Sequence, residues 1–316
     1  MKRILQIFLI IVILVIAAIY IGIGYAEENI LPYSILKPQR ITSKQSAEMY
    51  GMKSDPAEYN LRYDDLNIAV ADSVNLKGWF IYACTPKPIG TVLLLHGVAS
   101  CRASQLQFAA ILASKGMNCV LYDSRANGES GGEYCTYGYY EKKDVSKIID
   151  YVSANYPASG PYGIVGHSMG AATALQAMEI DKRLVCGIVM SPFGDFRKTI
   201  RDYIMHKVHL RLNKIADASI AKSEIIANYK ADSIKPAISA KHIEQPVMVI
   251  HGLEDKNVSA LYGREVYENL LSPDKIWFPI YKGGHNNLFS AGGKMMLDYS
   301  IAFLKKYISE AGSKHL

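Results

Sequence analysis

Two pentapeptides in this chain match G-x-S-x-G, a pattern in which a serine at a sharp turn between a strand and a helix can act as a nucleophile. They are GESGG at 128–132 and GHSMG at 166–170. Ser168 directly follows the apolar run YGIVG, which is typical of a buried strand, and precedes a segment rich in Gly and Ala that resembles a helix. Ser130 lies seven residues beyond Asp123, in a glycine-rich loop. The context therefore predicts Ser168 as the nucleophile and Ser130 as a loop residue.

A serine hydroxyl needs a base that removes its proton, and the base needs a carboxylate that orients it. His285 stands in YKGGHNNLF, a glycine-flanked loop directly after the last strand-like run. Asp255 follows an earlier run in VMVIHGLEDKNVS, with Glu254 beside it. The chain order serine, acid, histidine is typical of such a site. We therefore predict His285 as the base and Asp255 as the acid, with Asp195 as the weaker alternative acid.

Acyl transfer also develops a negative oxygen, which backbone N–H groups can stabilise. The helix after the serine presents the N–H of Met169 first, and the loop after TVLLLHG offers the N–H of Val98. We predict these two groups as the oxyanion donors. His96 and His167 stand next to these turns in the sequence and are interpreted as structural residues that hold them.

The elements that must position these residues alternate along most of the chain. Apolar runs rich in β-branched residues, such as TVLLLHG (91–97) and PVMVIHG (246–252), are separated by amphipathic segments such as EKKDVSKIIDYVSANY (141–156). This alternation predicts an α/β fold with a mostly parallel sheet covered by helices on both faces. About fifty residues of helical character interrupt the alternation before PVMVIHG and are expected to form a helical cap.

The N-terminus has a composition of its own. Lys2 and Arg3 precede an uncharged apolar run that ends at Ala26. About 20 helical residues cover the roughly 30 Å of hydrocarbon in a bilayer, so residues 1–26 are expected to form a transmembrane signal anchor. A cleaved signal peptide is the alternative, although its apolar core is usually shorter. The two cations favour a cytoplasmic N-terminus, and hence a single-pass protein of the cell membrane with an extracytoplasmic catalytic domain.

These patterns divide the chain into five segments. They are the anchor 1–26, a polar lead-in 27–62, the first part of the core 63–193, the helical cap 194–244 and the second part of the core 245–316. The net charge of +6 comes without blocks of Lys or Arg, so nothing indicates a nucleic-acid partner. The absence of a C-x-x-C pair gives no support for a zinc site.

Four segments together resemble the α/β-hydrolase superfamily: LLLHGVAS, YDSRANGESGG, GHSMGAATAL, and IHGLEDKNV with GGHNN. Within it, the chain is similar to the serine hydrolases grouped with the serine aminopeptidase and prolyl-oligopeptidase-like families, and to palmitoyl-thioesterase-like membrane hydrolases. The resemblance covers roughly residues 60–310. It implies the same triad and oxyanion donors, and no metal or organic cofactor. It also implies that D-x-R-x-x-G-x-S is a structural loop, which accounts for the second pentapeptide.

Two of the five cysteines, Cys101 and Cys135, follow the third and fourth strands of the predicted sheet. These strands are neighbours in the fold that the resemblance implies, so the two loops are expected to lie close together. In an oxidising compartment a Cys101–Cys135 disulfide could tie the loops beside the oxyanion donors. Two independent thiols are the alternative.

Three functions remain open at this point. The first is a membrane-anchored serine hydrolase that cleaves carboxylic esters or thioesters, with a small-molecule or lipid-like acyl substrate. The second is a serine peptidase of the aminopeptidase type. It is disfavoured because an exopeptidase needs acidic groups for the α-amino group of its substrate, whereas residues 194–223 of the cap are mostly basic. The third is a catalytically silent binding protein. The sequence does not indicate the oligomeric state of the protein.

Overall fold

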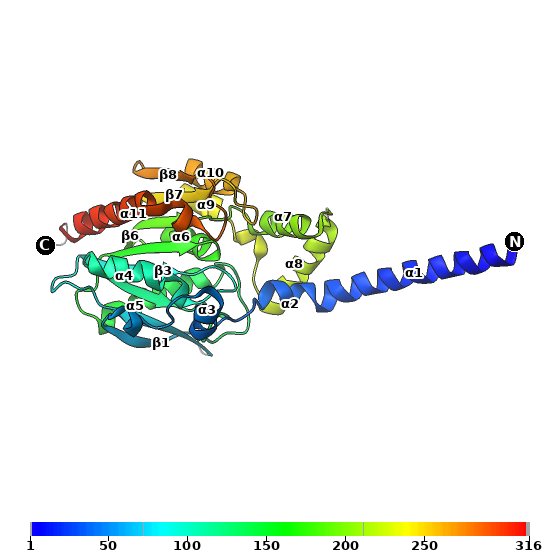
Figure 1. Cartoon of the computed structure of the whole chain (residues 1–316), viewed down its shortest axis with the longest axis horizontal. Coiled ribbons are helices and arrows are strands. Elements are labelled where there is room, and N and C mark those ends of the chain that lie inside the picture. The colour runs from blue at the N-terminus through cyan, green and yellow to red at the C-terminus, as the bar shows by residue number, and fades with distance from the viewer. Residues whose placement is uncertain (1, 72, 211, 314–316) are drawn as a thin grey trace.

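The structure, a computed structural model, describes residues 2–71, 73–210 and 212–313. An eight-stranded sheet runs through the body in the order β1-β2-β4-β3-β5-β6-β7-β8 (Figure 1). The strands are β1 (Tyr63–Ala71), β2 (Val74–Ile81), β3 (Gly90–Leu95), β4 (Met117–Tyr122), β5 (Tyr162–His167), β6 (Leu184–Met190), β7 (Val247–Gly252) and β8 (Lys275–Ile280).

The direction of the strands confirms the predicted, mostly parallel sheet. β1 and β2 form an antiparallel hairpin at one edge, and β2 pairs antiparallel with β4. Every pairing from β4 through β3, β5, β6 and β7 to β8 is parallel. β3, β4 and β7 are buried at every position, as parallel strands covered on both faces must be. The loops after the parallel strands therefore meet at one edge of the sheet, the carboxyl edge.

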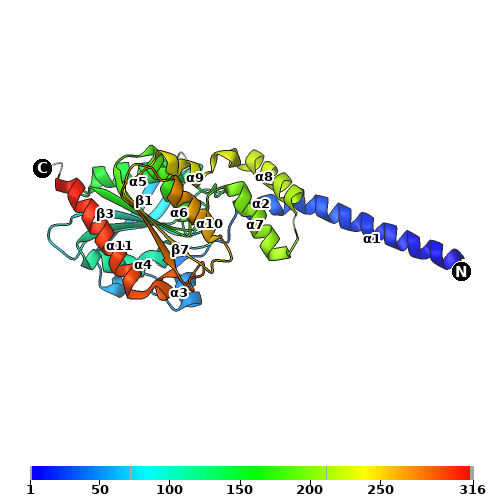
Figure 2. The same ribbon diagram turned by 90° about the horizontal axis from the view of Figure 1, so that it is seen from above.

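Helices cover both faces of the sheet (Figure 2). Because side chains alternate along a strand, Leu93 and Leu95 of β3 belong to the core on one face, whereas Val92 and Leu94 belong to the core on the other. The first core is covered by α5 (Glu141–Asn155), α6 (Met169–Ile180), α9 (Pro236–Ser239) and α10 (Ala260–Asn269). The second is covered by α4 (Leu106–Ser114) and α11 (Leu288–Ser313).

The segment between β6 and β7 is helical. It begins with α7 (Phe196–Val208) and α8 (Asn213–Ala227), which pack against each other beyond the carboxyl edge of the sheet (Figure 1). Two 3-10 turns, η3 (Ala231–Ser233) and η4 (Ala240–His242), flank α9 and lead back to β7. These helices occupy the stretch for which the sequence predicts a cap.

The N-terminal segment contains more regular structure than the sequence suggests. α1 (Lys2–Asn29) projects away from the body and is followed by α2 (Leu31–Leu36), α3 (Ser43–Tyr50) and the 3-10 turn η1 (Pro56–Tyr59) (Figures 1 and 2). Over the described residues, no helix combines the length and the apolar character that crossing a membrane requires. The segment 27–62 is packed against the rest of the protein, because α2 contacts α8 and α3 contacts η2 (Arg102–Gln105).

Candidate active site

Ser168 stands at the sharp turn between β5 and α6. Its backbone has φ 54° and ψ −115°, a left-handed conformation that is uncommon for a residue with a side chain. Such strain is of order 1–3 kcal/mol and persists only where the surroundings impose it. The backbone N–H of Ser168 donates to the carbonyl oxygen of Met190 at 2.8 Å, which fixes the turn on the neighbouring strand β6.

The two glycines of GHSMG are required by the close approach of backbone to backbone. A Cβ on Gly166 would lie 2.2 Å from the carbonyl oxygen of Gly170. A Cβ on Gly170 would lie 2.5 Å from the carbonyl oxygen of Leu95, in β3. Neither position can therefore carry a side chain unless α6 moves away from the sheet.

The structure brings Ser168, His285 and Asp255 together in one hydrogen-bonded chain. The Oγ of Ser168 lies 2.8 Å from Nε2 of His285, whose Nδ1 lies 2.7 Å from Oδ2 of Asp255. Ser168 follows β5, His285 follows β8 and Asp255 follows β7. All three therefore lie at the carboxyl edge of the sheet. The Asp255 side chain is fully buried and that of His285 is 11% exposed.

Four hydrogen-bond donors surround the carboxylate of Asp255. Oδ1 accepts the backbone N–H groups of Asn257 and Val258, each at 2.9 Å. Oδ2 faces Nδ1 of His285 and, at 3.4 Å, Nε2 of His251. Burial alone raises the pKa of Asp255, but the bonds from His251, His285 and Val258 outweigh it and hold the pKa well below its usual range. Asp255 is therefore ionised and able to orient the imidazole of His285.

The carboxylates of Glu254 and Asp195, which the sequence analysis also named, are not hydrogen-bonded to His285 in the described residues. The exposed Glu254 points elsewhere, and its backbone N–H donates to the carbonyl oxygen of Gly283. Asp195 caps α7 by accepting the N–H of Lys198 at 3.0 Å. Of these three carboxylates, that of Asp255 is the one hydrogen-bonded to the imidazole of His285.

The predicted oxyanion donors lie on either side of Ser168. Met169 opens α6, and its N–H has no carbonyl acceptor in the described part of the chain. The same holds for the N–H of Val98, within residues 2–71, 73–210 and 212–313. A Cβ on Gly97 would lie 3.4 Å from Cβ of Ser168, so the loop that carries Val98 passes directly beside the serine. Two unpaired N–H groups next to Ser168 can serve a developing oxyanion.

Two histidines hold the turns of the site, as expected from the sequence. Nδ1 of His96 donates to the carbonyl oxygen of Gly97 at 2.7 Å, and Nε2 accepts the N–H of Ser124 at 2.9 Å. His167 donates from Nε2 to the carbonyl oxygen of His285 at 2.8 Å. His251, by contrast, is a site residue that the sequence analysis missed. Its place four residues before Asp255 was the available signal.

Ser130 of the second pentapeptide is buried in a structural loop. Its Oγ donates to the carbonyl oxygen of Asp123 at 2.6 Å and accepts the N–H of Lys77 at 2.8 Å. The carboxylate of Asp123 is fully buried and paired with Arg102 at 2.5 Å. The hydroxyl of Ser130 thus has two backbone partners and no base.

The structure contains all five cysteines as free thiols, which corresponds to the second of the two alternatives for Cys101 and Cys135, independent thiols. Cys135 is buried against the nucleophile turn, with Sγ 3.3 Å from Sδ of Met169. Cys101 is buried in a different apolar cluster, and its thiol contacts Ser43 and Ser46 of α3. The two loops start on neighbouring strands, but the eleven residues between Asp123 and Cys135 carry the second thiol away from the first.

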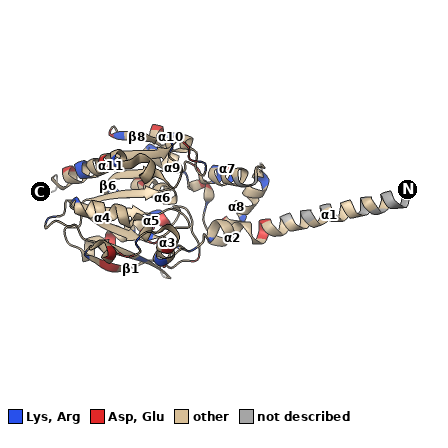
Figure 3. Ribbon diagram, viewed as in Figure 1, with Lys and Arg blue, Asp and Glu red and all other residues tan. Residues whose placement is uncertain are grey.

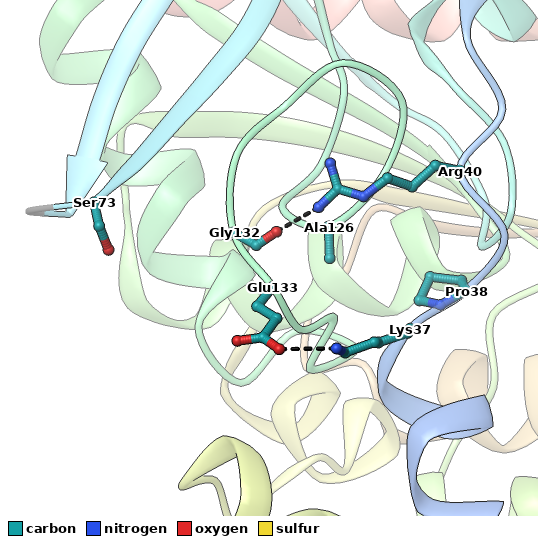
Figure 4. A pocket seen from close by; sticks show the side chains of 7 residues that line it. All are labelled: Lys37, Pro38, Arg40, Ser73, Ala126, Gly132 and Glu133. Carbon is teal, nitrogen blue, oxygen red and sulfur yellow. Dashed lines mark hydrogen bonds and ion pairs between the residues drawn. The ribbon is translucent and has the colours of Figure 1, made fainter. Parts of the chain in front are cut away.

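The segment after α2 is fastened to the loop that follows β4, and a surface pocket opens between them (Figure 4). Lys37 pairs with Glu133 at 2.8 Å. Arg40 donates to the carbonyl oxygens of Ser130, at 2.7 Å, and of Gly132. None of the residues that line this pocket belongs to the hydrogen-bonded chain of Ser168, so the pocket is separate from the candidate site.

An apolar cluster links α2, the cap and the loop before α5. Leu36 of α2 is fully buried there with Phe196, Ile220 and Tyr229. The hydroxyl of Tyr137 donates to the carbonyl oxygen of Ile35 at 2.9 Å.

The described residues contain no group of three or more His, Cys, Asp or Glu side chains that could hold a metal ion.

Sequence comparison finds one matching family model and several similar proteins. The family model of the serine aminopeptidase, S33, matches residues 86–239. The chain is 28% identical over 192 residues to the uncharacterized protein YqkD of Bacillus subtilis, covering 59% of this chain and 62% of that protein. It is 26% identical to the alpha/beta hydrolase domain-containing protein WAV2 of Arabidopsis thaliana, covering 81% and 82%. The match to lysophosphatidylserine lipase ABHD12 of Rattus norvegicus is 25% identical and covers 58% and 46%.

The first of these matches spans less than two thirds of the Bacillus protein, and the last spans less than half of the lipase. Among solved structures, the esterase Pf2001 of Pyrococcus furiosus superposes with a TM-score of 0.70 at 25% identity, covering 87% of this chain and 98% of that chain. An acylaminoacyl peptidase of Pyrococcus horikoshii shares the fold, with a TM-score of 0.61 at 19% identity, covering 79% and 42%. With the strand order described above, these findings show that the chain has the α/β-hydrolase fold and belongs to the α/β-hydrolase superfamily.

Proposed function

We propose that this protein is a serine hydrolase that cleaves carboxylic esters or thioesters through a Ser-His-Asp triad and an acyl-enzyme. The observation that carries the proposal is the hydrogen-bonded chain from Ser168 Oγ through His285 to Asp255, with distances of 2.8 and 2.7 Å. A nucleophile, a base and an orienting carboxylate within hydrogen-bond reach are what covalent acyl transfer needs.

The geometry supports the following steps. Nε2 of His285 accepts the Ser168 proton as Oγ attacks the acyl carbonyl. The N–H groups of Val98 and Met169 stabilise the tetrahedral oxyanion, each contributing about 3 kcal/mol in comparable sites. His285 then protonates the leaving alcohol or thiol, and a water molecule, activated by the same imidazole, hydrolyses the acyl-enzyme. Asp255 stabilises the imidazolium in both halves of the reaction.

We further propose a membrane-anchored protein with an extracytoplasmic catalytic domain. Support comes from α1, where Phe8, Leu14 and Ile21 are 64%, 62% and 70% exposed. Apolar side chains exposed along a projecting helix favour a membrane or another protein as partner. Lys2 and Arg3 before the apolar run favour a cytoplasmic N-terminus.

The same arrangement favours a lipid-like acyl substrate. α1 contacts α8 of the cap and α2, and the cap follows β6 at the carboxyl edge where Ser168 lies. A bilayer that held α1 would therefore lie next to the cap and the candidate site. One relative, named lysophosphatidylserine lipase, acts by its name on a single-chain phospholipid, and a structural neighbour is named an esterase.

A fluorophosphonate probe tests the nucleophile on the full-length chain in detergent. We expect labelling of the wild type, loss of labelling in Ser168→Ala, and retained labelling in Ser130→Ala, because the Ser130 hydroxyl serves only the loop. A panel of p-nitrophenyl esters and acyl thioesters of rising chain length then defines the acyl pocket. If a folded wild type failed to label, the catalytically silent binding protein would replace this proposal.

Membrane attachment is tested by fractionation of cells that express the full chain or the chain without residues 2–26. We expect the full chain to stay with membranes after alkaline carbonate extraction, and the shortened chain to leave them. Protease added outside intact spheroplasts should degrade the catalytic domain if it is extracytoplasmic. Release of the full chain by carbonate would contradict the anchor.

A serine peptidase remains the second candidate, because the matching family model is that of a serine aminopeptidase. Against it stands the charge of the cap, where α7 contains more Lys and Arg than Asp and Glu residues (Figure 3). Hydrolysis of aminoacyl p-nitroanilides at a kcat/KM above that for p-nitrophenyl esters would favour the peptidase. We expect the opposite ratio.

A further inference from the structure

The ring of His167 lies between two loops of the candidate site. His167 is the last residue of β5, directly before Ser168. Its Nε2 donates to the backbone carbonyl oxygen of His285 at 2.8 Å, and the two imidazole rings lie 5.0 Å apart, tilted by 44°. His167 therefore contacts the loop of the proposed base through its main chain, and the base's two ring nitrogens stay free for Ser168 and Asp255.

The Nδ1 edge of the ring lies near the loop of the proposed oxyanion donor. A Cβ built on Gly97 would come within 3.4 Å of Nδ1 of His167 and within 3.4 Å of Cβ of Ser168. Gly97 directly precedes Val98, whose N–H is unpaired among the described residues. One imidazole thus spaces the serine, the Val98 loop and the His285 loop from one another.

The protonation state of His167 suits this role. A carbonyl oxygen only accepts hydrogen bonds, so Nε2 must carry the proton. Burial, together with the positive charge that His285 can carry, lowers the pKa of His167 to about 4, while the bond to the His285 carbonyl and the charge of Asp255 act in the other direction. The positive charge that His251 can carry is the smallest of the effects that together lower the pKa of His167. His167 is therefore neutral while His285 takes up a proton.

We propose that His167 is a positioning residue, which holds the His285 loop and the Val98 loop at their working distance from Ser168. The inference rests on the proposed serine hydrolase function. It assigns to His167 no contact with substrate and no proton transfer. Its effect is exerted through His285, since a loop freed from the Nε2 bond would let the imidazole drift from Ser168 Oγ.

Two substitutions separate the donor from the bulk of the ring. His167→Gln keeps an amide N–H near the place of Nε2, whereas His167→Phe keeps a planar ring of similar size without a donor. We expect His167→Phe to lower kcat about 100-fold, as a displacement near 1 Å at a catalytic group does. We expect His167→Gln to stay within about tenfold of the wild type, the worth of one neutral hydrogen bond. The KM should change little in either variant.

His242 provides the matched control, because its side chain is 61% exposed on η4 and its partner is Glu179. His242→Phe and His242→Gln should leave kcat unchanged. The proton between His285 Nδ1 and Asp255 gives a second readout, since a short hydrogen bond to a carboxylate produces a low-field proton resonance. This resonance should persist in His167→Gln and broaden or shift in His167→Phe, at a temperature where both variants are folded.

The outcomes separate the two proposals. A wild type that reacts with fluorophosphonate while His167→Phe keeps kcat within about threefold, less than one hydrogen bond is worth, overturns the positioning role alone. Equal losses in His167→Gln and His167→Phe, with the low-field resonance unchanged, also overturn it. A wild type that does not react at all refutes the proposed function, and the positioning role with it.

Discussion

Replacing Asp255 by asparagine reverses a single hydrogen bond, and the structure fixes the direction of the reversal. Oδ1 of Asp255 accepts two backbone N–H groups, from Asn257 and Val258, each at 2.9 Å. An amide NH2 cannot occupy that place, so the amide oxygen stays there and the NH2 takes the place of Oδ2. It then faces Nδ1 of His285 at about 2.7 Å. An NH2 cannot accept a hydrogen bond, so Nδ1 must become the acceptor.

The consequence is the wrong tautomer of His285. With Nδ1 as an acceptor, the ring proton moves to Nε2, which then points an N–H at Ser168 Oγ in place of a lone pair. The base is lost although no atom has moved far. In comparable triads this change lowers kcat about 10⁴-fold, which corresponds to about 5 kcal/mol of transition-state stabilisation. KM should change little, because Asp255 is buried and out of reach of substrate.

The assay is the steady-state hydrolysis of a p-nitrophenyl ester by the full-length chain, with the rate of fluorophosphonate labelling as an independent readout. Glu254→Gln is the matched control, since it makes the same chemical change at the neighbouring, exposed carboxylate. Asp195→Asn tests the alternative acid. The reasoning is refuted if Asp255→Asn keeps a tenth or more of the wild-type kcat, or if either control loses as much activity as Asp255→Asn does.

Three further outcomes follow from packing and charge. Gly166→Ala should destabilise the protein by about 3 kcal/mol in urea unfolding, because the new Cβ would meet the Gly170 carbonyl oxygen at 2.2 Å; an unchanged midpoint would contradict this. Arg102→Met should lower the free energy of unfolding by about 3–5 kcal/mol, because it leaves the fully buried carboxylate of Asp123 without a cationic partner. Stability that depends on neutral His167 is complete above pH 6.5 and is lost as the pH falls toward about 4. Between pH 6.5 and pH 4 the free energy of unfolding of the wild type should fall by up to about 3 kcal/mol relative to that of His167→Gln. If the unfolding free energies of the two proteins changed in parallel with pH, the lowered pKa of His167 would be refuted.

The N-terminal segment gives the fold a feature that a bare hydrolase core would lack. α2 buries Leu36 under the cap, and Leu36 accepts the N–H of Cys135 through its carbonyl oxygen at 2.8 Å. Cys135 in turn lies against Met169, the first residue of α6. The chain that leads to α1 is therefore packed, through two contacts, onto the turn that carries Ser168.

Local sequence was sufficient for the fold class and for placing GHSMG, and not GESGG, at the turn between a strand and a helix. Uniformly apolar runs alternating with amphipathic helices can be buried only as a parallel sheet covered on both faces. GHSMG joins such a run to a helix of small residues, and its glycines are those that the observed backbone contacts require. Ser130 lacks that context and turned out to be held by the backbone of Asp123 and Lys77.

Contacts between distant parts of the chain were decided only by the tertiary structure. Sequence order favoured Asp255 as the partner of His285 but gave no reason against Asp195, because the answer depends on how the loop after β7 folds so that Asp255 accepts two backbone N–H groups. The sequence left the pairing of Cys101 and Cys135 open for the same reason, since neighbouring strands do not determine where the loop after β4 carries its cysteine. The contact of His251 with the Asp255 carboxylate was equally hidden. Composition and periodicity report which side chains are buried, whereas hydrogen-bond partners depend on distances of a few tenths of an ångström across segments more than a hundred residues apart.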